Sequence, residues 1–137
     1  KQILSLVSNM LFNKIHHVAI IVSNYEISKN FYVNILGFKI LKETYREDRN
    51  SYKLDLMIGD DYQIELFSFP NPPKRVDSPE ASGLRHLAFE VDSIEKTVEY
   101  LNSKNIITEP IRIDNITGKK FTFFKDPDSL PLEIYEK

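Results

Sequence analysis

Apolar and polar residues alternate in short segments along most of the chain, a pattern typical of strands with one buried face. Two of these segments match each other, since residues 17–23 read HVAIIVS and residues 86–92 read HLAFEVD. Each segment ends at a residue that can cap a helix, and a glutamate follows three positions later, as in Ser23 with Glu26 and Asp92 with Glu95. This is the spacing of a capping box, so each segment is predicted to lead from a strand directly into a helix.

Two amphipathic helices are predicted after these strands, because apolar residues recur there with the period of a helix that has one buried face. The expected apolar stripes are Ile27, Phe31 and Ile35 in the first helix and Ile94, Val98 and Leu101 in the second. Gly37 follows the first stripe and is a typical helix-ending residue. Both helices are therefore expected to pack on a sheet.

Three further alternating segments, rich in aromatic and β-branched residues, follow each predicted helix. The expected strands are residues 38–46, 52–58 and 62–69 in the first half and residues 111–113, 120–124 and 132–135 in the second. Each half thus has the order β-α-β-β-β, and the predicted fold class is α+β with two βαβββ modules.

A proline-rich stretch separates the two halves, and proline cannot join the centre of a strand ladder. We expect module 1 at residues 14–69, an extended linker at 70–83 and module 2 at 84–137, which together form a single domain. Residues 1–13 are expected to be an N-terminal extension, with Met10 near the natural start of the protein and residues 1–9 upstream of it.

Composition narrows the functional class. The chain has 137 residues, of which 42% are apolar and 28% are charged, so one soluble globular domain is expected. It has no cysteine, which excludes disulfide scaffolds, thiolate zinc sites and cysteine nucleophiles and fits a protein of the reducing cytoplasm. A net charge of −2 gives no basic footprint for nucleic acid, and no apolar run is long enough to cross a membrane.

Four side chains at equivalent places in the repeat are the candidates for chemistry. Strand alternation turns His17 and His86 away from the helices, and Glu65 and Glu133 follow them at offsets of 48 and 47 residues. Each module thus offers one imidazole and one carboxylate on the face of its sheet opposite the helix. Adjacent His16 is expected to point to the other face and is excluded from the set.

Two imidazoles and two carboxylates are the donor set of a divalent metal site. Buried charges must be paired or coordinate a metal, and these donors suit zinc, nickel, cobalt, manganese or iron. The alternative is that the histidines are ordinary core residues and that the glutamates pair with nearby lysine or arginine. The matching offsets in the repeat favour the metal site.

The repeated module and the four residues His17, Glu65, His86 and Glu133 resemble the vicinal oxygen chelate superfamily, in its glyoxalase I-like and bleomycin-resistance-like branch. The resemblance covers residues 14–137. It is closest to the small bacterial glyoxalase-like proteins of the YaeR type, in the segments at residues 45–47, 64–70, 83–89 and 121–124.

The resemblance implies a cupped mixed sheet around one divalent ion, either nickel, cobalt, zinc or manganese, held by those four residues. It also implies a metal-bound enediolate, with Glu133 as the catalytic base and Glu65 as the other acidic ligand. Some branches of the family use three protein ligands, and the epimerases have Gln at the place of Glu65. The glutamate here favours the glyoxalase I side. A homodimer is implied too, with each site built within one chain or between two.

Two positions depart from the glyoxalase I pattern. That enzyme has Arg and Asn to hold glutathione where this chain has Ile21 and Phe69, so glutathione is disfavoured and another small vicinal-oxygen substrate is expected. Arg46 and Arg85 are the candidate anchors for an anionic substrate, and ordinary surface charge is the alternative for both. The aromatic residues Phe121, Phe123 and Phe124 are expected in the core and the wall of the cup.

The sequence therefore predicts a metal-dependent lyase or isomerase of the glyoxalase I type that acts on a small molecule. One alternative is a non-catalytic small-molecule binding protein of the bleomycin-resistance type. An epimerase or a thiol transferase of the same superfamily is another.

Overall fold

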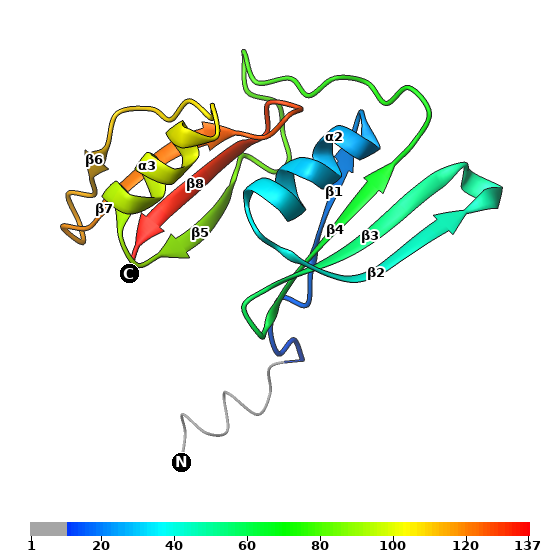
Figure 1. Ribbon diagram of the computed structural model, residues 1–137, viewed down its shortest axis with the longest axis horizontal. Coiled ribbons are helices and arrows are strands. Elements are labelled where there is room, and N and C mark those ends of the chain that lie inside the picture. The colour runs from blue at the N-terminus through cyan, green and yellow to red at the C-terminus, as the bar shows by residue number, and fades with distance from the viewer. Residues whose placement is uncertain (1–10) are drawn as a thin grey trace.

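The computed structural model describes residues 11–137, so Met10 and residues 1–9 of the expected N-terminal extension lie outside the described range. The described residues form two four-stranded mixed sheets, each with a helix over one face (Figure 1). The predicted α+β fold with two βαβββ modules is confirmed.

The first sheet is built by the N-terminal half of the chain. Its elements are β1 (Val18–Val22), α2 (Tyr25–Lys29), the π-helix η1 (Asn30–Ile35), β2 (Lys39–Arg46), the short 3-10 helix η2 (Glu47–Arg49), β3 (Ser51–Ile58) and β4 (Tyr62–Ser68). The strand order is β1-β4-β3-β2, with β1 parallel to β4 and the other neighbours antiparallel. The helical segment formed by α2 and η1 therefore connects β1 to the β2–β3 hairpin across one face of the sheet.

The second sheet repeats this topology with a shorter outer hairpin. Its elements are β5 (Leu87–Val91), α3 (Ile94–Ser103), β6 (Arg112–Ile113), β7 (Lys120–Lys125) and β8 (Pro131–Glu136). The order is β5-β8-β7-β6, and β5 is again parallel to its neighbour β8. Within residues 11–137 the longest helix, α3, has 10 residues, and no helix of this range is long and apolar enough to cross a membrane.

Strand alternation places the core between each sheet and its helix, as the pattern predicted. Ile20 and Val22 of β1 are buried, whereas Ile21 between them is 56% exposed. Leu66 of β4 and Leu132 of β8 are fully buried on the same side as the helices. The face of each sheet opposite its helix, called here the open face, carries the side chains that alternate with these apolar residues.

The predicted caps are each wrong by one residue. Asn24, not Ser23, caps α2 by accepting a hydrogen bond from the Ile27 amide at 3.1 Å. Ser93, not Asp92, caps α3 in the same way. The Ser23 amide and hydroxyl instead donate to Asp128 in the second module, a partner that a local spacing rule does not include.

The predicted apolar stripe of the first helix is also partly wrong, because Ile27 is 55% exposed. The second half of this helix is a π-helix, in which the Leu36 amide donates to the Phe31 carbonyl five residues earlier. The wider turn shifts the helical phase, so that Tyr32 is buried beside Phe31. The stripe of α3 is confirmed, with Ile94 and Leu101 buried.

A buried polar contact joins the two modules. The Tyr32 hydroxyl of η1 donates to the Asp126 carboxylate at 2.7 Å, and the side chains of both residues are buried. Amides of Asp128 and Leu130 also donate to Asp126, so the carboxylate orders the turn between β7 and β8. Phe31 packs against Phe124 beside this contact.

The variant Tyr32→Phe tests how much this contact stabilises the fold. A buried acceptor that loses its donor costs about 1–3 kcal/mol, and urea unfolding is expected to show a loss of free energy of unfolding in that range. Tyr45→Phe is the matched control, because it removes an exposed hydrogen bond to Asn50 and is expected to change stability by less than about 0.5 kcal/mol. Equal effects of the two variants would contradict a special role for Tyr32.

The Asp126 carboxyl gives a pH dependence of defined sign. Burial raises the pKa of Asp126 above its usual range, although the hydrogen bonds to it act in the opposite direction. The native state therefore favours the protonated form, and stability falls as pH rises from the unfolded pKa of about 3.9 to the raised native pKa. The unfolding free energy of the parent minus that of Asp126→Asn is expected to decrease across this window and then level off. An increase with pH would be the contrary result.

Candidate functional site

The first predicted pair, His17 and Glu65, meets on the open face of the first sheet. The Nε2 atom of His17 lies 3.5 Å from Oε2 of Glu65, and the glutamate side chain is only 9% exposed. Ile64 and Leu66 of β4 pack toward the helix, which forces Glu65 to the opposite side. In the strand register Glu65 lies between Ala19 of β1 and Asp55 of β3.

The Glu65 carboxylate has two further polar neighbours on this open face. The Gln63 side-chain amide donates to Oε2 of Glu65 at 3.2 Å. The Lys53 ammonium lies 3.9 Å from the same oxygen and 3.3 Å from Oδ1 of Asp55. Lys53 thus neutralises part of the charge of two adjacent carboxylates, and these contacts hold Glu65 in place.

The second predicted pair, His86 and Glu133, meets on the open face of the second sheet. The Nε2 atom of His86 lies 3.1 Å from Oε1 of Glu133, with the side chains 30% and 14% exposed. The His86 ring also meets Phe123 edge-on, with 5.1 Å between ring centroids. In the register Glu133 lies between Ala88 and Phe123, which is the arrangement of Glu65 in the first sheet.

The two open faces differ in the residue beside each glutamate. Asp55 occupies the position in the first sheet that Phe123 occupies in the second. The residue next to the glutamate is therefore a carboxylate in one half of the repeat and an aromatic ring in the other.

One chain forms the two pairs but does not gather all four residues. Among residues 11–137, no group of three or more His, Asp or Glu side chains lies close enough to hold a metal ion. The expectation that His16 faces the other way is wrong, since Nδ1 of His16 lies 2.9 Å from Nδ1 of His17. Both histidines precede β1, so strand alternation does not govern them.

The four candidate substrate residues lie in different surroundings. The Arg46 guanidinium stacks over Phe67 and Phe69, with its central carbon 4.7 and 5.6 Å from the ring centroids. Arg85 makes an exposed ion pair with Glu80 at 3.2 Å beside His86. Ile21 lines a small cavity of about 230 Å³ near the joint between the modules.

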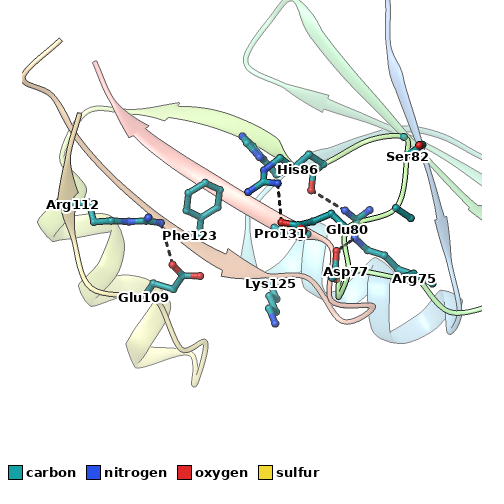
Figure 2. A pocket seen from close by; sticks show the side chains of 14 residues that line it. Arg75, Asp77, Glu80, Ser82, His86, Glu109, Arg112, Phe123, Lys125 and Pro131 are labelled. Atoms are coloured by element: carbon teal, nitrogen blue, oxygen red, sulfur yellow. Dashed lines mark hydrogen bonds and ion pairs between the residues drawn. The ribbon is translucent and has the colours of Figure 1, made fainter. Parts of the chain in front are cut away.

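A larger cavity of about 590 Å³ opens beside His86 and Phe123 (Figure 2). Three basic residues that the sequence did not single out line it, namely Arg75, Arg112 and Lys125. Strand alternation in residues 120–125 places Lys125 on the same face of the sheet as Phe123, so the sequence alone could have indicated Lys125. Arg75 and Arg112 depend on contacts distant in sequence, which no local pattern reports.

Arg75 positions the chain segment that leads into His86. Its Nε atom donates to Asp77 at 2.6 Å, and one of its terminal nitrogens donates to the carbonyls of Leu84 and Arg85, both at 2.9 Å. These carbonyls belong to the two residues just before His86. The linker therefore fixes the start of β5 through one guanidinium.

The variant Arg75→Met is expected to loosen this segment. Hydrogen bonds to a charged group contribute about 1.5–3 kcal/mol each, so amide hydrogen exchange at residues 86–88 should accelerate by about tenfold or more. Arg85→Met is the matched control, because it removes a neighbouring cation whose ion pair is about 70% exposed. If exchange is unchanged in Arg75→Met, or equally fast in both variants, Arg75 does not position His86.

Known proteins resemble this chain over nearly its full length. The YwkD protein of Bacillus subtilis is 63% identical over 93% of this chain and 100% of its own length. The YaeR protein of Escherichia coli is 56% identical over 90% of this chain and 96% of its own length. The crystal structure of a glyoxalase family protein from Enterococcus faecalis superposes with a TM-score of 0.86 and 54% identity, covering 93% of this chain and all of that one.

The family model for this group of proteins matches most of the described chain, at residues 14–134. The two βαβββ modules are the fold predicted from the resemblance to this family, and the 56% identity to the YaeR protein agrees with the predicted YaeR type. The chain belongs to the glyoxalase/bleomycin resistance protein/dioxygenase superfamily.

Proposed function

We propose that this protein is a divalent-metal-dependent lyase or isomerase of the glyoxalase I type, which acts on a small substrate with neighbouring oxygen atoms. The observation that carries the proposal is the pair of His–Glu contacts, at 3.5 and 3.1 Å, in register-equivalent places on two open faces. Ordinary core histidines have no reason to repeat this arrangement in both halves of a chain.

The spacing within each pair suits two ligands of one ion. Ligands about 2.1 Å from a metal and separated by 90–109° lie roughly 3.0–3.4 Å apart, and the second pair falls in this range while the first lies just beyond it. Two nitrogen and two oxygen donors without thiolate suit nickel, cobalt, zinc or manganese. His17, Glu65, His86 and Glu133 are the residues that would hold the ion. When bound, it would stabilise negative charge on the substrate oxygens.

A second copy of the chain completes the site in this proposal. Each chain contributes its pairs on separate sheets, and the described residues of one chain bring no three ligands together. If the first sheet of one protomer faces the second sheet of its partner, all four ligands can converge twice in a symmetric dimer. Members of this superfamily in which each site is built between two chains provide the precedent.

Glu133 is the residue we assign to proton transfer. Its side chain is 14% exposed and contacts His86, which lines the large cavity, so the carboxylate lies next to the space where a small molecule fits. A carboxylate at this place can take a proton from one substrate carbon and return it to the neighbouring carbon. Glu65, held by Gln63 and Lys53, is less free to move and serves as the fixed acidic ligand.

Two more distant relatives favour an enzyme, and their names match the two alternative reaction types. The metallothiol transferase FosB of Staphylococcus saprophyticus is 29% identical over 91% of this chain. The mitochondrial methylmalonyl-CoA epimerase of Dictyostelium discoideum is 25% identical over 97% of it. Solvent deuterium in the product with no thiol consumed would favour an epimerase, and net consumption of a thiol would favour a transferase.

Elemental analysis of the tag-free protein tests the proposal. We expect about one divalent ion per chain, lost in His86→Ala and in His17→Ala and retained in the control His16→Ala. With metal bound, 2-oxoaldehydes should be turned over in the presence of a suitable thiol, and Glu133→Gln should lower the rate by about 10²–10⁴-fold. A parent that neither contains nor takes up metal would contradict the enzyme assignment and leave a ligand-binding protein.

Mixing two inactive variants tests the shared site. One variant carries His17→Ala with Glu65→Gln, and the other carries His86→Ala with Glu133→Gln. Neither alone should hold metal, but random re-pairing of the two should restore about a quarter of the parental metal content, because half of the dimers then contain one intact site. A parent that holds metal with no recovery in the mixture would show that a single chain forms the site.

A further inference from the structure

The large cavity beside His86 has a cation on each side of its aromatic wall. Along β7, strand alternation puts Phe121, Phe123 and Lys125 on the open face with Glu133, while Phe124 is buried. Arg112 of β6 is the register partner of Phe121. Figure 2 shows Arg112 reaching toward Phe123 from one side, with Lys125 on the other.

Aromatic rings hold the Arg112 guanidinium in place. Its central carbon lies 5.1 Å from the Phe121 ring centroid and 5.2 Å from that of Phe123. The Phe123 ring in turn meets the His86 ring edge-on. Stacking on a ring face uses the flat side of a guanidinium and leaves its N–H donors free to bind a planar oxyanion in the plane of the group.

The present partner of Arg112 is weakly held. One terminal nitrogen of Arg112 lies 3.1 Å from Oε1 of Glu109, and the two side chains are 50% and 55% exposed. Exposed ion pairs three residues apart contribute little, so a ligand oxyanion can replace Glu109. Lys125 makes no ion pair with any of the residues that the structure describes.

The other two cations of this cavity are less suitably placed. Arg75 donates to Asp77 and to two backbone carbonyls, which uses three of its five N–H groups and holds the guanidinium on the linker. Arg85 lies at the rim in an ion pair with Glu80 whose side chains are 72% and 69% exposed, and among the described residues no aromatic ring stacks on its guanidinium as Phe121 and Phe123 do on that of Arg112. We therefore favour Arg112 and Lys125 over Arg85, the candidate from the sequence, for the recognition of an anion.

We propose that the cavity beside His86 binds a small molecule that ends in an oxyanion, either a carboxylate or a phosphate. Arg112 and Lys125 bind the oxyanion, and the Phe123 ring packs against the carbon skeleton that leads toward His86 and Glu133. The cavity volume of about 590 Å³ suits a small metabolite. This inference rests on the proposed function, because it names the substrate class of the same site.

Ligand-observed NMR titration of the full chain tests the inference with four probes at constant ionic strength. Butyrate and glycerol 3-phosphate carry the two kinds of oxyanion, and butyramide and glycerol are their neutral counterparts. We expect the anions to bind and the neutral molecules not to bind. The tighter of the two anions identifies the oxyanion that the site prefers.

Variants separate specific recognition from general charge. Arg112→Gln is expected to weaken binding of the preferred anion by about tenfold or more, and Lys125→Gln by several-fold. Glu109→Gln should strengthen binding, because it removes the carboxylate that competes for Arg112. Lys96→Gln, which removes the same charge from exposed helix α3, should leave binding unchanged.

Equal binding of the neutral probes, equal weakening by Lys96→Gln and Arg112→Gln, or no gain in Glu109→Gln would each overturn the inference. Repeating the titration with EDTA distinguishes it from the proposed function. Anion binding that persists without metal and depends on Arg112 supports the cavity assignment even if no metal site exists. Binding that is lost with EDTA and is unaffected by Arg112→Gln would assign the anion to the metal and would overturn it.

Discussion

A single buried hydrogen bond, from the Tyr32 hydroxyl to the Asp126 carboxylate, ties the two modules of this protein together. A carboxylate this deep is costly unless donors surround it, and Asp126 is satisfied by the phenol and by two backbone amides. The same turn holds Ser23 through Asp128, so the end of β1 is fixed by the second module. The placement of the two open faces therefore rests on this buried contact together with the Ser23–Asp128 hydrogen bonds and the packing of Phe31 on Phe124.

The repeat explains why each half has a His–Glu pair, and the two pairs differ in their neighbours. Asp55 lies beside Glu65 and Lys53 contacts both carboxylates, whereas Phe123 lies beside Glu133. The duplicated framework thus keeps one pair in each half while the residues around the pair differ.

Strand alternation was enough to predict both sheets and the faces of Glu65 and Glu133. It succeeded because Ile64 and Leu66, like Leu132 and Ile134, can be buried only if the glutamate between them points the other way. His17 and His86 lie one residue before β1 and β5, and their contacts with the glutamates are what place them on the open faces. The predictions of the two helix caps and of a buried Ile27 failed for reasons that the local sequence does not show. Ser23 finds its partner 105 residues away, and a π-turn shifts the phase of the first helix. Arg75 and Arg112 likewise gain their roles from linker and register contacts that a single sequence does not reveal.

Arg75 also changes how the linker between the modules should be understood. A passive tether could be lengthened, shortened or replaced with little effect, because the entropy of closing a loop grows slowly with its length. This one instead places a guanidinium on the two carbonyls that precede His86. The hydrogen bonds of Arg75 close the ten-residue segment between Arg75 and His86 into a loop. The length of this segment therefore helps to fix the position of His86. We therefore expect insertions to be tolerated in the outer hairpins more readily than between Arg75 and His86.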